Sequence, residues 1–320
     1  MNLNDRIAAA AKRIGPYVRE TPLLWSPGLS ELVGTRVFLK LENLQVTGSF
    51  KARGALNKVL ALTAEERARG VVTASSGNHG VAVANAGRQA GIVPTVFLPT
   101  NAAPNKIAKI KKLGAVVEFF GDDSGLTEIH ARSVAERTGQ VFVSPYNDLD
   151  VVAGQGTIGL EMMAQCPTLG AVVVAVGGGG LIGGIASYCK AERPDLLVVG
   201  SSPANSCVMA ESVRQGSILD LPSLPTLADG TAGGVEPGTV TFAMCRDLVD
   251  RYDLPSEAEI AEGMRLLFAE ERLACEGAAG LALATAIRVA VQLRGRDVAV
   301  VLCGGNVDVE TWCRVMGGDG

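Results

Sequence analysis

The chain has 320 residues, 48% of them hydrophobic and 19% charged, a balance typical of a globular protein with length for one large or two ordinary domains. Lys and Arg number 29 against 33 for Asp and Glu, so the formal net charge is −4, which disfavours nucleic acid or an acidic membrane surface as a partner. The 39 glycines, which show no collagen period, point to loops with close backbone approach.

The N-terminal part of the chain predicts a helix and then a strand. Residues 4–14 have helical apolar spacing up to Gly15-Pro16, and residues 36–41 alternate as a strand does. A second helix is expected after Ser49, which can act as its N-cap. The apolar face of that helix would consist of Ala52, Ala55, Leu56, Val59 and Leu60.

Short β-branched runs then alternate with helical stretches. Strands are expected at 71–74, 95–98, 115–119, 141–143, 171–176, 196–200 and 298–302. Helices are expected at 79–90, 104–113, 126–137, 151–164, 182–192, 256–272 (with Ser256 as N-cap) and 277–294. Near-continuous apolar strands are typical of parallel sheets covered by helices on both faces, so the predicted fold class is α/β.

Two stretches are candidate crossings between domains. Residues 63–70 are charged and turn-like, and a polar run follows Pro145. If the chain crosses at both places, residues 63–146 form a small domain inserted into a large one made of residues 1–62 and 147–320.

The segment Thr47-Gly48-Ser49-Phe50-Lys51 places a lysine in the first turn of the second helix. An ammonium group there opposes the helix dipole, and burial would further favour the neutral amine. Both effects suit a nucleophilic or Schiff-base lysine. The alternative is that Lys51 is one of many solvated basic residues. The basic run Lys106, Lys109, Lys111 and Lys112 is interpreted as a solvated helix face.

The segment Ser75-Ser76-Gly77-Asn78-His79-Gly80 lies between a strand end and a helix start. Free N–H groups at a helix N-terminus, together with Ser and Asn side chains, suit an anion such as a substrate carboxylate. The alternative is an ordinary capped turn, since these residue types are common in turns.

Four consecutive glycines, 177–180, directly follow the strand expected at 171–176. Such a run costs backbone entropy and packs nothing, so it suits main-chain N–H groups wrapped around a phosphate. Its match to G-x-G-x-x-G keeps a nicotinamide-dependent enzyme open. A dinucleotide site should place an acid after the next strand, where Gly200-Ser201-Ser202 offers none, so a single phosphate fits better. A structural turn is the other alternative.

Two cysteine-containing segments complete the set of candidates. Cys275-Glu276-Gly277 opens a helix, and Cys303-Gly304-Gly305-Asn306 follows the last strand, at the end where α/β proteins usually bind ligands. Cys303 could instead be a buried apolar thiol.

The cysteines as a group predict neither a metal site nor disulfides. None of the seven forms a C-x-x-C pair, and only His79 and His130 could add imidazole ligands. The odd count, with no signal-peptide pattern at the beginning, favours free thiols and a cytoplasmic protein.

Taken together, Ser49-Phe50-Lys51, Ser75-Ser76-Gly77-Asn78-His79-Gly80, the four glycines and Cys303-Gly304-Gly305-Asn306 resemble the pyridoxal-phosphate-dependent serine/threonine dehydratase and serine racemase family in order and spacing. The likeness runs from about Pro22 to Asp308. It implies a fold of the tryptophan-synthase-β type (PLP fold type II). In that fold, two open twisted α/β domains hold pyridoxal 5′-phosphate in the cleft between them, usually in a homodimer.

The resemblance implies a role for each matching residue. Lys51 would hold the cofactor as a Schiff base and later move the α-proton, and Ser76 would serve as acid or base on the opposite face. Cys303 would face the pyridine nitrogen, where a neutral partner favours elimination over transamination. The other cofactor-binding residues would be Phe50 beside the ring, Asn78 at the 3-hydroxyl, Gly177, Gly178, Gly179, Gly180 and Leu181 around the phosphate, and Glu276. The substrate would be bound by Ser75, Ser76, Gly77, Asn78 and His79.

The chain also departs from the family. The carboxylates that bind an activating metal in the family are missing around Ser202, and Thr127 stands where serine racemase has an arginine near its substrate. The chain stops at Gly320, so a C-terminal regulatory domain and feedback by a branched-chain amino acid are not expected.

We therefore expect a lyase that converts a 3-hydroxy amino acid to a 2-oxo acid and ammonia. Serine and threonine are the default substrates, and the departures at Thr127 and Ser202 leave room for a bulkier one such as phenylserine. The alternatives are an amino-acid racemase of the same family, a nicotinamide-dependent oxidoreductase and a non-catalytic amino-acid-binding module, which should carry a signal peptide.

Overall fold

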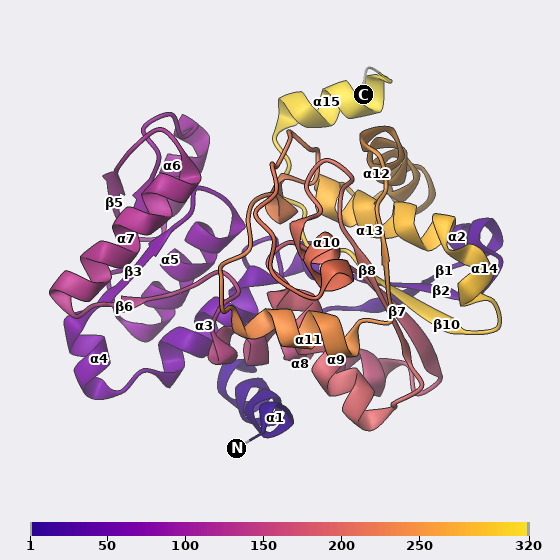
Figure 1. Ribbon diagram of the computed structural model, residues 1–320, viewed down its shortest axis with the longest axis horizontal. Coiled ribbons are helices and arrows are strands. Elements are labelled where there is room, and N and C mark those ends of the chain that lie inside the picture. The colour runs from indigo at the N-terminus through magenta and orange to yellow at the C-terminus, as the bar shows by residue number, and fades with distance from the viewer. Residues whose placement is uncertain (1, 319–320) are drawn as a thin grey trace.

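The computed structural model describes residues 2–318, whose strands form two sheets (Figure 1). The larger sheet has the order β1 (Leu23–Ser26), β2 (Val37–Lys40), β10 (Asp297–Val301), β7 (Leu169–Ala175), β8 (Leu197–Ser201) and β9 (Arg251–Asp253). The smaller sheet has the order β5 (Val116–Phe119), β4 (Thr95–Leu98), β3 (Val71–Ala74) and β6 (Val141–Phe142). β1 runs antiparallel to β2, and the other neighbours are parallel.

Helices cover both faces of the larger sheet. On one face, Val172 and Val174 of β7 share a core with α8 (Leu149–Gln165) and α9 (Gly180–Glu192). On the other face, Val173 packs with Leu283 and its neighbours on α13 (Gly277–Arg288). Successive residues of the strand are thus buried on opposite sides, which explains its unbroken apolar sequence.

The smaller sheet is covered in the same way (Figure 1). Phe97 and Val72 pack with α7 (Ser124–Thr138) on one face. Val71 packs on the other face with α3 (Lys51–Ala61) and α5 (Asn78–Ala90). The four strands of this sheet lie between residues 71 and 142. The domain boundaries at 62/63 and 146/147 stay a prediction.

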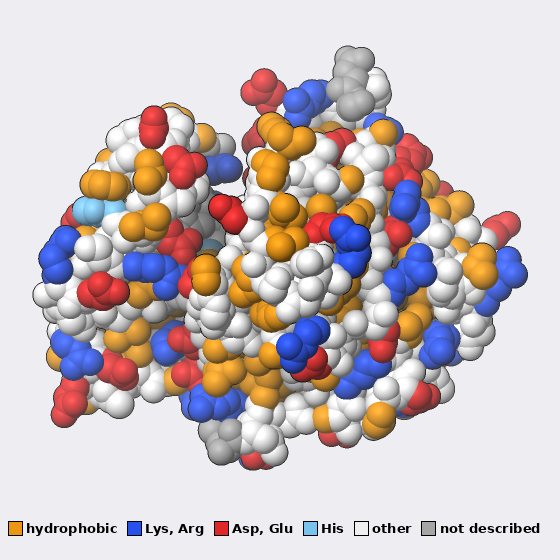
Figure 2. Space-filling model, viewed as in Figure 1, with side chains coloured by type: hydrophobic (Ala, Val, Ile, Leu, Met, Phe, Trp, Pro, Cys, Tyr) orange, Lys and Arg blue, Asp and Glu red, His pale blue; other side chains and the backbone are white. Residues whose placement is uncertain are grey.

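The remaining helices complete the two parts of the molecule. They are α1 (Leu3–Ile14), α2 (Pro27–Val33), α4 (Ala64–Arg69), α6 (Pro104–Lys112), α10 (Val208–Gln215), α11 (Val240–Leu248), α12 (Glu257–Glu271), α14 (Ala290–Leu293) and α15 (Val309–Gly317), with 3₁₀ turns η1 (Glu42–Leu44) and η2 (Asp229–Thr231). Among residues 2–318, none of the helices combines the length and the apolar character that crossing a membrane requires. Figure 2 shows a hollow between the part with the smaller sheet and the rest of the molecule, with acidic and basic side chains mixed over the visible face.

Several local predictions need correction. Residues 63–70 are not a turn but contain α4, which begins with a capping box in which Thr63 and Glu66 bond each other's main-chain N–H. Ser49 does not cap α3, because Phe50 is the N-cap and the buried Ser49 hydroxyl has no partner among the described residues. The helix expected at 277–294 is divided at Val289. Ser256 is confirmed as the N-cap of α12.

Candidate active site

Lys51 is the first residue of α3, and its amine points at the segment that joins β6 to α8. Its Nζ donates a hydrogen bond to the main-chain oxygen of Pro145 at 2.8 Å and lies 5.1 Å from the centre of the Phe50 ring. Burial lowers the pKa of Lys51 to about 8, although Cys303 and Glu276 act in the opposite direction. The amine is therefore still mainly protonated near physiological pH, but its neutral, nucleophilic form is far more populated than in an exposed lysine.

The loop before Lys51 is fixed by the end of β10. Phe50 N donates to the carbonyl of Cys303 at 3.0 Å, and Ser49 forms an isolated antiparallel bridge with Gly304. The loop turns at Gly48, whose φ of 78° favours glycine, and Gly305 N donates to its carbonyl at 2.9 Å. Lys51 is thus held at the carboxyl end of a central parallel strand, where open α/β sheets bind ligands.

Asn78, Glu276 and Cys303 meet in a buried polar cluster. Asn78 Nδ2 donates to both carboxylate oxygens of Glu276, at 3.1 and 2.9 Å, and Cys303 Sγ lies 3.8 Å from Glu276 Oε1. Burial raises the pKa of Glu276 and the pKa of the Cys303 thiol. Asn78, predicted for the 3-hydroxyl, and Cys303, predicted for the pyridine nitrogen, therefore both contact the carboxylate of Glu276. Cys303 is a neutral thiol at physiological pH.

Asn306 extends this cluster towards the smaller sheet. Its Nδ2 donates to Asn78 Oδ1 at 2.6 Å and to the carbonyl of Thr47 at 3.0 Å. Lys109 Nζ donates to Asn306 Oδ1 at 2.6 Å. Lys111 and Lys112 are exposed on α6 as the sequence predicts. Lys109 is also exposed, but its ammonium group reaches the candidate site, so the interpretation as a purely solvated face is wrong for this residue.

The glycine run forms a tight loop between β7 and α9. A Cβ on Gly177 would lie 2.8 Å from the carbonyl oxygen of Thr231, and one on Gly178 would lie 2.4 Å from the ring of Tyr146. Gly179 has a φ of 83°, and a Cβ there would lie 2.6 Å from Cys245 Sγ. Only glycines fit these positions, and they lead directly into the N-terminus of α9, where main-chain N–H groups attract a phosphate.

Two neighbours hold this loop in place. Leu181 anchors the first turn of α9 with a side chain that is 5% exposed. Thr241 Oγ1, at the start of α11, donates to the carbonyl of Gly178 at 2.7 Å. The glycine loop is therefore held by the buried Leu181 on one hand and by the hydrogen bond from α11 on the other.

The segment 75–79 forms a turn at the start of α5. Ser75 Oγ accepts from Gly77 N at 3.2 Å, and a Cβ on Gly80 would lie 1.9 Å from the carbonyl oxygen of Ser75, so this fold needs a glycine at position 80. Gly77 is the N-cap without a side-chain hydrogen bond to the first turn. The partly exposed residues Ser75, Ser76, Gly77 and Asn78 thus surround N–H groups that can bind an anion.

His79 differs from the other residues of this turn because its imidazole is 4% exposed. Nε2 lies 2.9 Å from the carbonyl of Val143 and must donate to it, which leaves Nδ1 as a buried acceptor without a partner among the described residues. Burial lowers the pKa of His79 to about 3, with a contribution from Lys51, so the ring is neutral. Because the imidazole is buried, only the main-chain N–H of His79 can contact a substrate.

The hydroxyls of Thr127 and Ser202 are both turned into the protein. Thr127 Oγ1 donates to the carbonyls of Phe120 and Asp123, at 2.8 and 2.7 Å, and Ser202 Oγ donates to the carbonyl of Val176 at 3.1 Å. Each residue is 1% exposed. Neither hydroxyl is thus presented to a substrate, and the expectation of a bulkier substrate stays a prediction.

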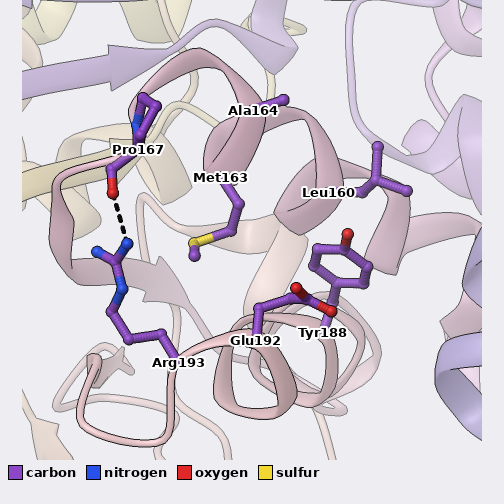
Figure 3. A pocket seen from close by; sticks show the side chains of 7 residues that line it. All are labelled: Leu160, Met163, Ala164, Pro167, Tyr188, Glu192 and Arg193. Atoms are coloured by element: carbon purple, nitrogen blue, oxygen red, sulfur yellow. Dashed lines mark hydrogen bonds between the residues drawn. The ribbon is translucent and has the colours of Figure 1, made fainter.

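A surface pocket between α8 and α9 lies apart from these residues (Figure 3). It is at the C-terminal ends of the two helices, whereas the glycine run precedes the N-terminus of α9. Its lining residues are Leu160, Met163, Ala164, Pro167, Tyr188, Glu192 and Arg193. None of the predicted site residues belongs to this pocket.

Sequence reasoning missed the contacts made by Pro145, Tyr146, Thr241, Lys109 and Asn306. Asn306 stood in a motif that the sequence analysis quoted, but without a role. Lys109 was named only as part of a solvated basic run, and Pro145, Tyr146 and Thr241 lie outside the motifs, where only their place near a strand or helix end was a signal. Among residues 2–318, no group of three or more His, Cys, Asp or Glu side chains is arranged to hold a metal ion.

The observed donor set fits pyridoxal phosphate. A buried amine with a lowered pKa suits an aldehyde, and a loop that a Cβ would fill, at a helix N-terminus, suits one phosphate. Asn78 and the neutral Cys303 offer a donor for an oxygen and a weak partner for a ring nitrogen. No acid follows β8, as a dinucleotide site would require.

Comparison with known proteins supports the same cofactor. Residues 14–304 match the family described as "Pyridoxal-phosphate dependent enzyme". The L-threonine ammonia-lyase of Thermotoga maritima is 42% identical over 312 residues, which cover 98% of this chain and 77% of that protein. The serine racemase of Arabidopsis thaliana is 38% identical over 308 residues, which cover 95% of this chain and 92% of that protein.

The fold is also shared with solved structures. The structure of maize serine racemase superimposes with a TM-score of 0.92 at 34% identity and covers 98% of this chain and 97% of that one. The predicted resemblance, fold class and cofactor are confirmed, and the oxidoreductase and binding-module alternatives are not supported. The chain belongs to the family of pyridoxal-phosphate dependent enzymes.

Proposed function

We propose that this enzyme removes water from a 3-hydroxy amino acid of the L-serine or L-threonine type and releases a 2-oxo acid and ammonia. The observation that carries the proposal is that the half-buried Lys51 amine and the neutral Cys303 thiol are both held at the carboxyl end of β10, where Phe50 N donates to the carbonyl of Cys303. The similarity to a threonine ammonia-lyase over 98% of the chain supports it.

Lys51, Gly177 to Leu181, Asn78 and Cys303 would hold the cofactor. When bound, pyridoxal phosphate supplies an electron sink for the charge that develops at the α-carbon. Lys51 takes the α-proton from the substrate, and its pKa of about 8 suits a base that works near neutral pH. A neutral Cys303 thiol beside the ring nitrogen would leave that nitrogen largely unprotonated, which would favour loss of the β-substituent over transamination.

The turn at 75–79 would bind the substrate carboxylate. Its N–H groups lie at the uncapped start of α5, where the helix dipole favours an anion. Asn78, the residue of this turn that bonds Glu276, connects it to the cluster with Cys303 that lies beside Lys51.

A racemase is the second candidate function. Its support is the similarity to the serine racemases of Arabidopsis and maize and the presence of Ser76 in the carboxylate turn. In that reaction Ser76 would exchange a proton on the face opposite Lys51. Chiral analysis of the product separates the two activities, since a dehydratase gives an oxo acid and a racemase gives the D-amino acid.

The remaining predictions complete the proposal. A bulkier substrate such as phenylserine is retained as a candidate, although Thr127 and Ser202 do not support it.

A homodimer is supported by exposed apolar side chains on β1 and α2, where Leu24, Trp25 and Leu32 are 47%, 56% and 49% exposed. A reducing cytoplasm is supported by the seven free cysteines. Light scattering during size-exclusion chromatography tests the dimer.

The decisive experiment records the visible spectrum of the purified protein and assays 2-oxo acid and ammonia. L-serine, L-threonine and phenylserine are compared, with Lys51→Ala as the inactive control. Oxo acid and ammonia in equal amounts from L-serine or L-threonine support the proposal. Mainly D-amino acid, with little oxo acid, would establish the racemase instead.

A further inference from the structure

Glu236 joins three segments that are far apart in the sequence. It belongs to the loop 232–239 between η2 and α11. Its Oε1 accepts from Arg132 of α7 at 2.6 Å, its Oε2 accepts from Asn147 Nδ2 at 2.8 Å, and its main-chain N–H donates to the Tyr146 hydroxyl at 3.0 Å. A single residue thus ties the loop to a helix of the smaller-sheet part and to the segment 145–147.

The segment 145–147 in turn touches the candidate active site on two sides. The carbonyl of Pro145 accepts the hydrogen bond from Lys51 Nζ at 2.8 Å. The Tyr146 ring packs so closely on the glycine loop that a Cβ on Gly178 would lie 2.4 Å from it. Asn147 Oδ1 also accepts from Val240 N at 3.0 Å. A shift of this segment would therefore move two groups together: the Pro145 carbonyl that accepts from the Lys51 amine, and the Tyr146 ring that packs on the glycine loop.

The ion pair between Arg132 and Glu236 is partly shielded from water, and other contacts of Arg132 fix its geometry. Their side chains are 33% and 26% exposed, so the pair is only partly screened by water. The Arg132 guanidinium lies 4.2 Å from the centre of the Phe142 ring and also pairs with Glu128 on its own helix at 2.7 Å. These contacts hold the guanidinium in the position that meets Glu236.

The loop that carries Glu236 is anchored to the larger-sheet part by Val235, which is 8% exposed in its core, and by Gly233 N, which donates to Ser206 Oγ at 3.2 Å. Gly233 and Gly238 have φ values of 120° and 72°, and a Cβ on Gly233, Gly234 or Gly238 would meet nothing within 4 Å. These glycines therefore give the backbone freedom and do not serve close packing. The Glu236 side chain links this anchored loop to α7 through Arg132.

We propose that Glu236 is a positioning residue that couples the contact between α7 and the loop 232–239 to the placement of the Lys51 amine and the phosphate loop. With the Arg132 pair formed, Glu236 holds Asn147 and Tyr146, and Pro145 presents its carbonyl to Lys51. With the pair lost, the segment 145–147 is anchored less firmly. This inference rests on the proposed role of Lys51.

The test is a double-mutant cycle with Arg132→Met and Glu236→Gln, measured on the holoenzyme with the substrate that the parent protein converts fastest. Each single variant should lower kcat per bound cofactor on the order of fivefold and should speed cofactor release, which is followed by the visible absorbance. The double variant should be no worse than either single variant, because both remove the same interaction. Arg132→Lys should restore part of the lost activity.

Two matched variants separate this role from general effects. Arg137→Met removes another arginine of α7, which bonds only Ser133 of the same helix among the described residues. This variant should change neither kcat per bound cofactor nor the rate of cofactor release. Glu128→Gln removes the pair within α7 and should have a smaller effect than Glu236→Gln. Thermal unfolding of every variant checks that the fold is kept.

The outcome also separates this inference from the proposed function. Borohydride reduction and peptide mapping of each preparation show whether Lys51 carries the cofactor. If Lys51 is labelled but kcat per cofactor and cofactor release are unchanged in Glu236→Gln, or if the effects of the two single variants add in the double one, the positioning role is refuted. If another lysine is labelled in the parent protein, the proposed function fails and this inference falls with it.

Discussion

Asn78 Nδ2 lies 3.1 and 2.9 Å from the two carboxylate oxygens of Glu276, although 198 positions separate the two residues. The contact joins the start of α5, beside the smaller sheet, to the N-cap of α13, beside the larger one. Asn78 Oδ1 accepts from Asn306 Nδ2 at 2.6 Å, so only the amide hydrogens of Asn78 can face Glu276. The side chain is therefore oriented as a donor, which the predicted bond to the 3-hydroxyl oxygen of the cofactor requires.

The Lys51 amine should react with pyridoxal phosphate at a lower pH than an exposed lysine. Burial lowers its pKa from 10.5 to about 8. A lowered pKa means that the neutral amine predominates above that value, so attachment of the cofactor to the apoprotein should speed up with rising pH and level off above about pH 8. Stopped-flow absorbance measures this rate.

The same samples identify the lysine. After borohydride reduction and digestion, the label should be on Lys51, and Lys51→Ala should neither form the linkage nor turn over substrate. A rate that keeps rising to about pH 10, the range of an ordinary lysine, or a label elsewhere, would contradict the assignment.

Gly179→Ala should weaken binding of the cofactor. The backbone there has a φ of 83°, and the new Cβ would lie 2.6 Å from Cys245 Sγ, so the loop must shift away from the position that suits a phosphate. We expect at least a tenfold rise in the dissociation constant, for a loss of about 1.4 kcal/mol. A spectroscopic titration of the apoprotein measures it.

Gly216→Ala is the matched control for this prediction. Gly216 ends α10 with a φ of 81°, and a Cβ there would meet nothing within 4 Å. Both variants should lose about 1–2 kcal/mol of unfolding free energy from backbone strain, but only Gly179→Ala should lose cofactor affinity. Equal affinities in the two variants would show that the glycine loop is structural. Tight binding of NAD by the parent protein would refute the single-phosphate site.

Arg53→Met should strongly destabilise the protein. Arg53 is 0% exposed and bonds Glu42, also 0% exposed, at 2.9 and 2.7 Å, and it contacts Glu161 at 2.5 Å. Removing the guanidinium leaves a buried carboxylate without its partner, which costs roughly 3–5 kcal/mol of unfolding free energy. Arg214→Met, which breaks an exposed pair with Glu211, should cost less than about 1 kcal/mol. Urea denaturation compares them, and equal losses would show that burial of the Arg53 pair is not decisive.

The alternation of strands and helices could be predicted because the buried strands are unbroken apolar runs. The strand expected at 171–176 is observed as β7 (Leu169–Ala175). The strands β1 and β9 were missed because their sequences, Leu-Leu-Trp-Ser and Arg-Tyr-Asp, contain no β-branched residue. α4 could have been predicted, since Thr63 and Glu66 have the spacing of a capping box, but its charge was interpreted as a turn.

The site motifs could be predicted to meet because they follow the carboxyl ends of parallel strands. The residues that connect them could not, because contacts such as the one between Glu236 N and Tyr146, 90 positions apart, depend on where two loops lie. It could not be predicted either that the hydroxyls of Thr127 and Ser202 bond main-chain carbonyls inside the protein. The sequence gives the position of a residue along an element, but not the hydrogen bonds of its hydroxyl.

Ser76→Ala tests which face of the substrate each residue serves. Elimination needs one base for the α-proton, whereas racemisation needs a second group on the other face. If Lys51 is the first and Ser76 the second, the variant should lose D-amino acid formation before it loses oxo acid formation. Ser76 also lies in the anion-binding turn, where a lost hydrogen bond to a charged group costs on the order of 1.5–3 kcal/mol, so KM should rise as well. Both products are measured from the same L-substrate, with Ser133→Ala as a control, because the half-buried Ser133 of α7 bonds only Arg137 of its own helix among the described residues. Racemisation that survives unchanged in Ser76→Ala would mean that Ser76 only binds substrate or shapes the turn.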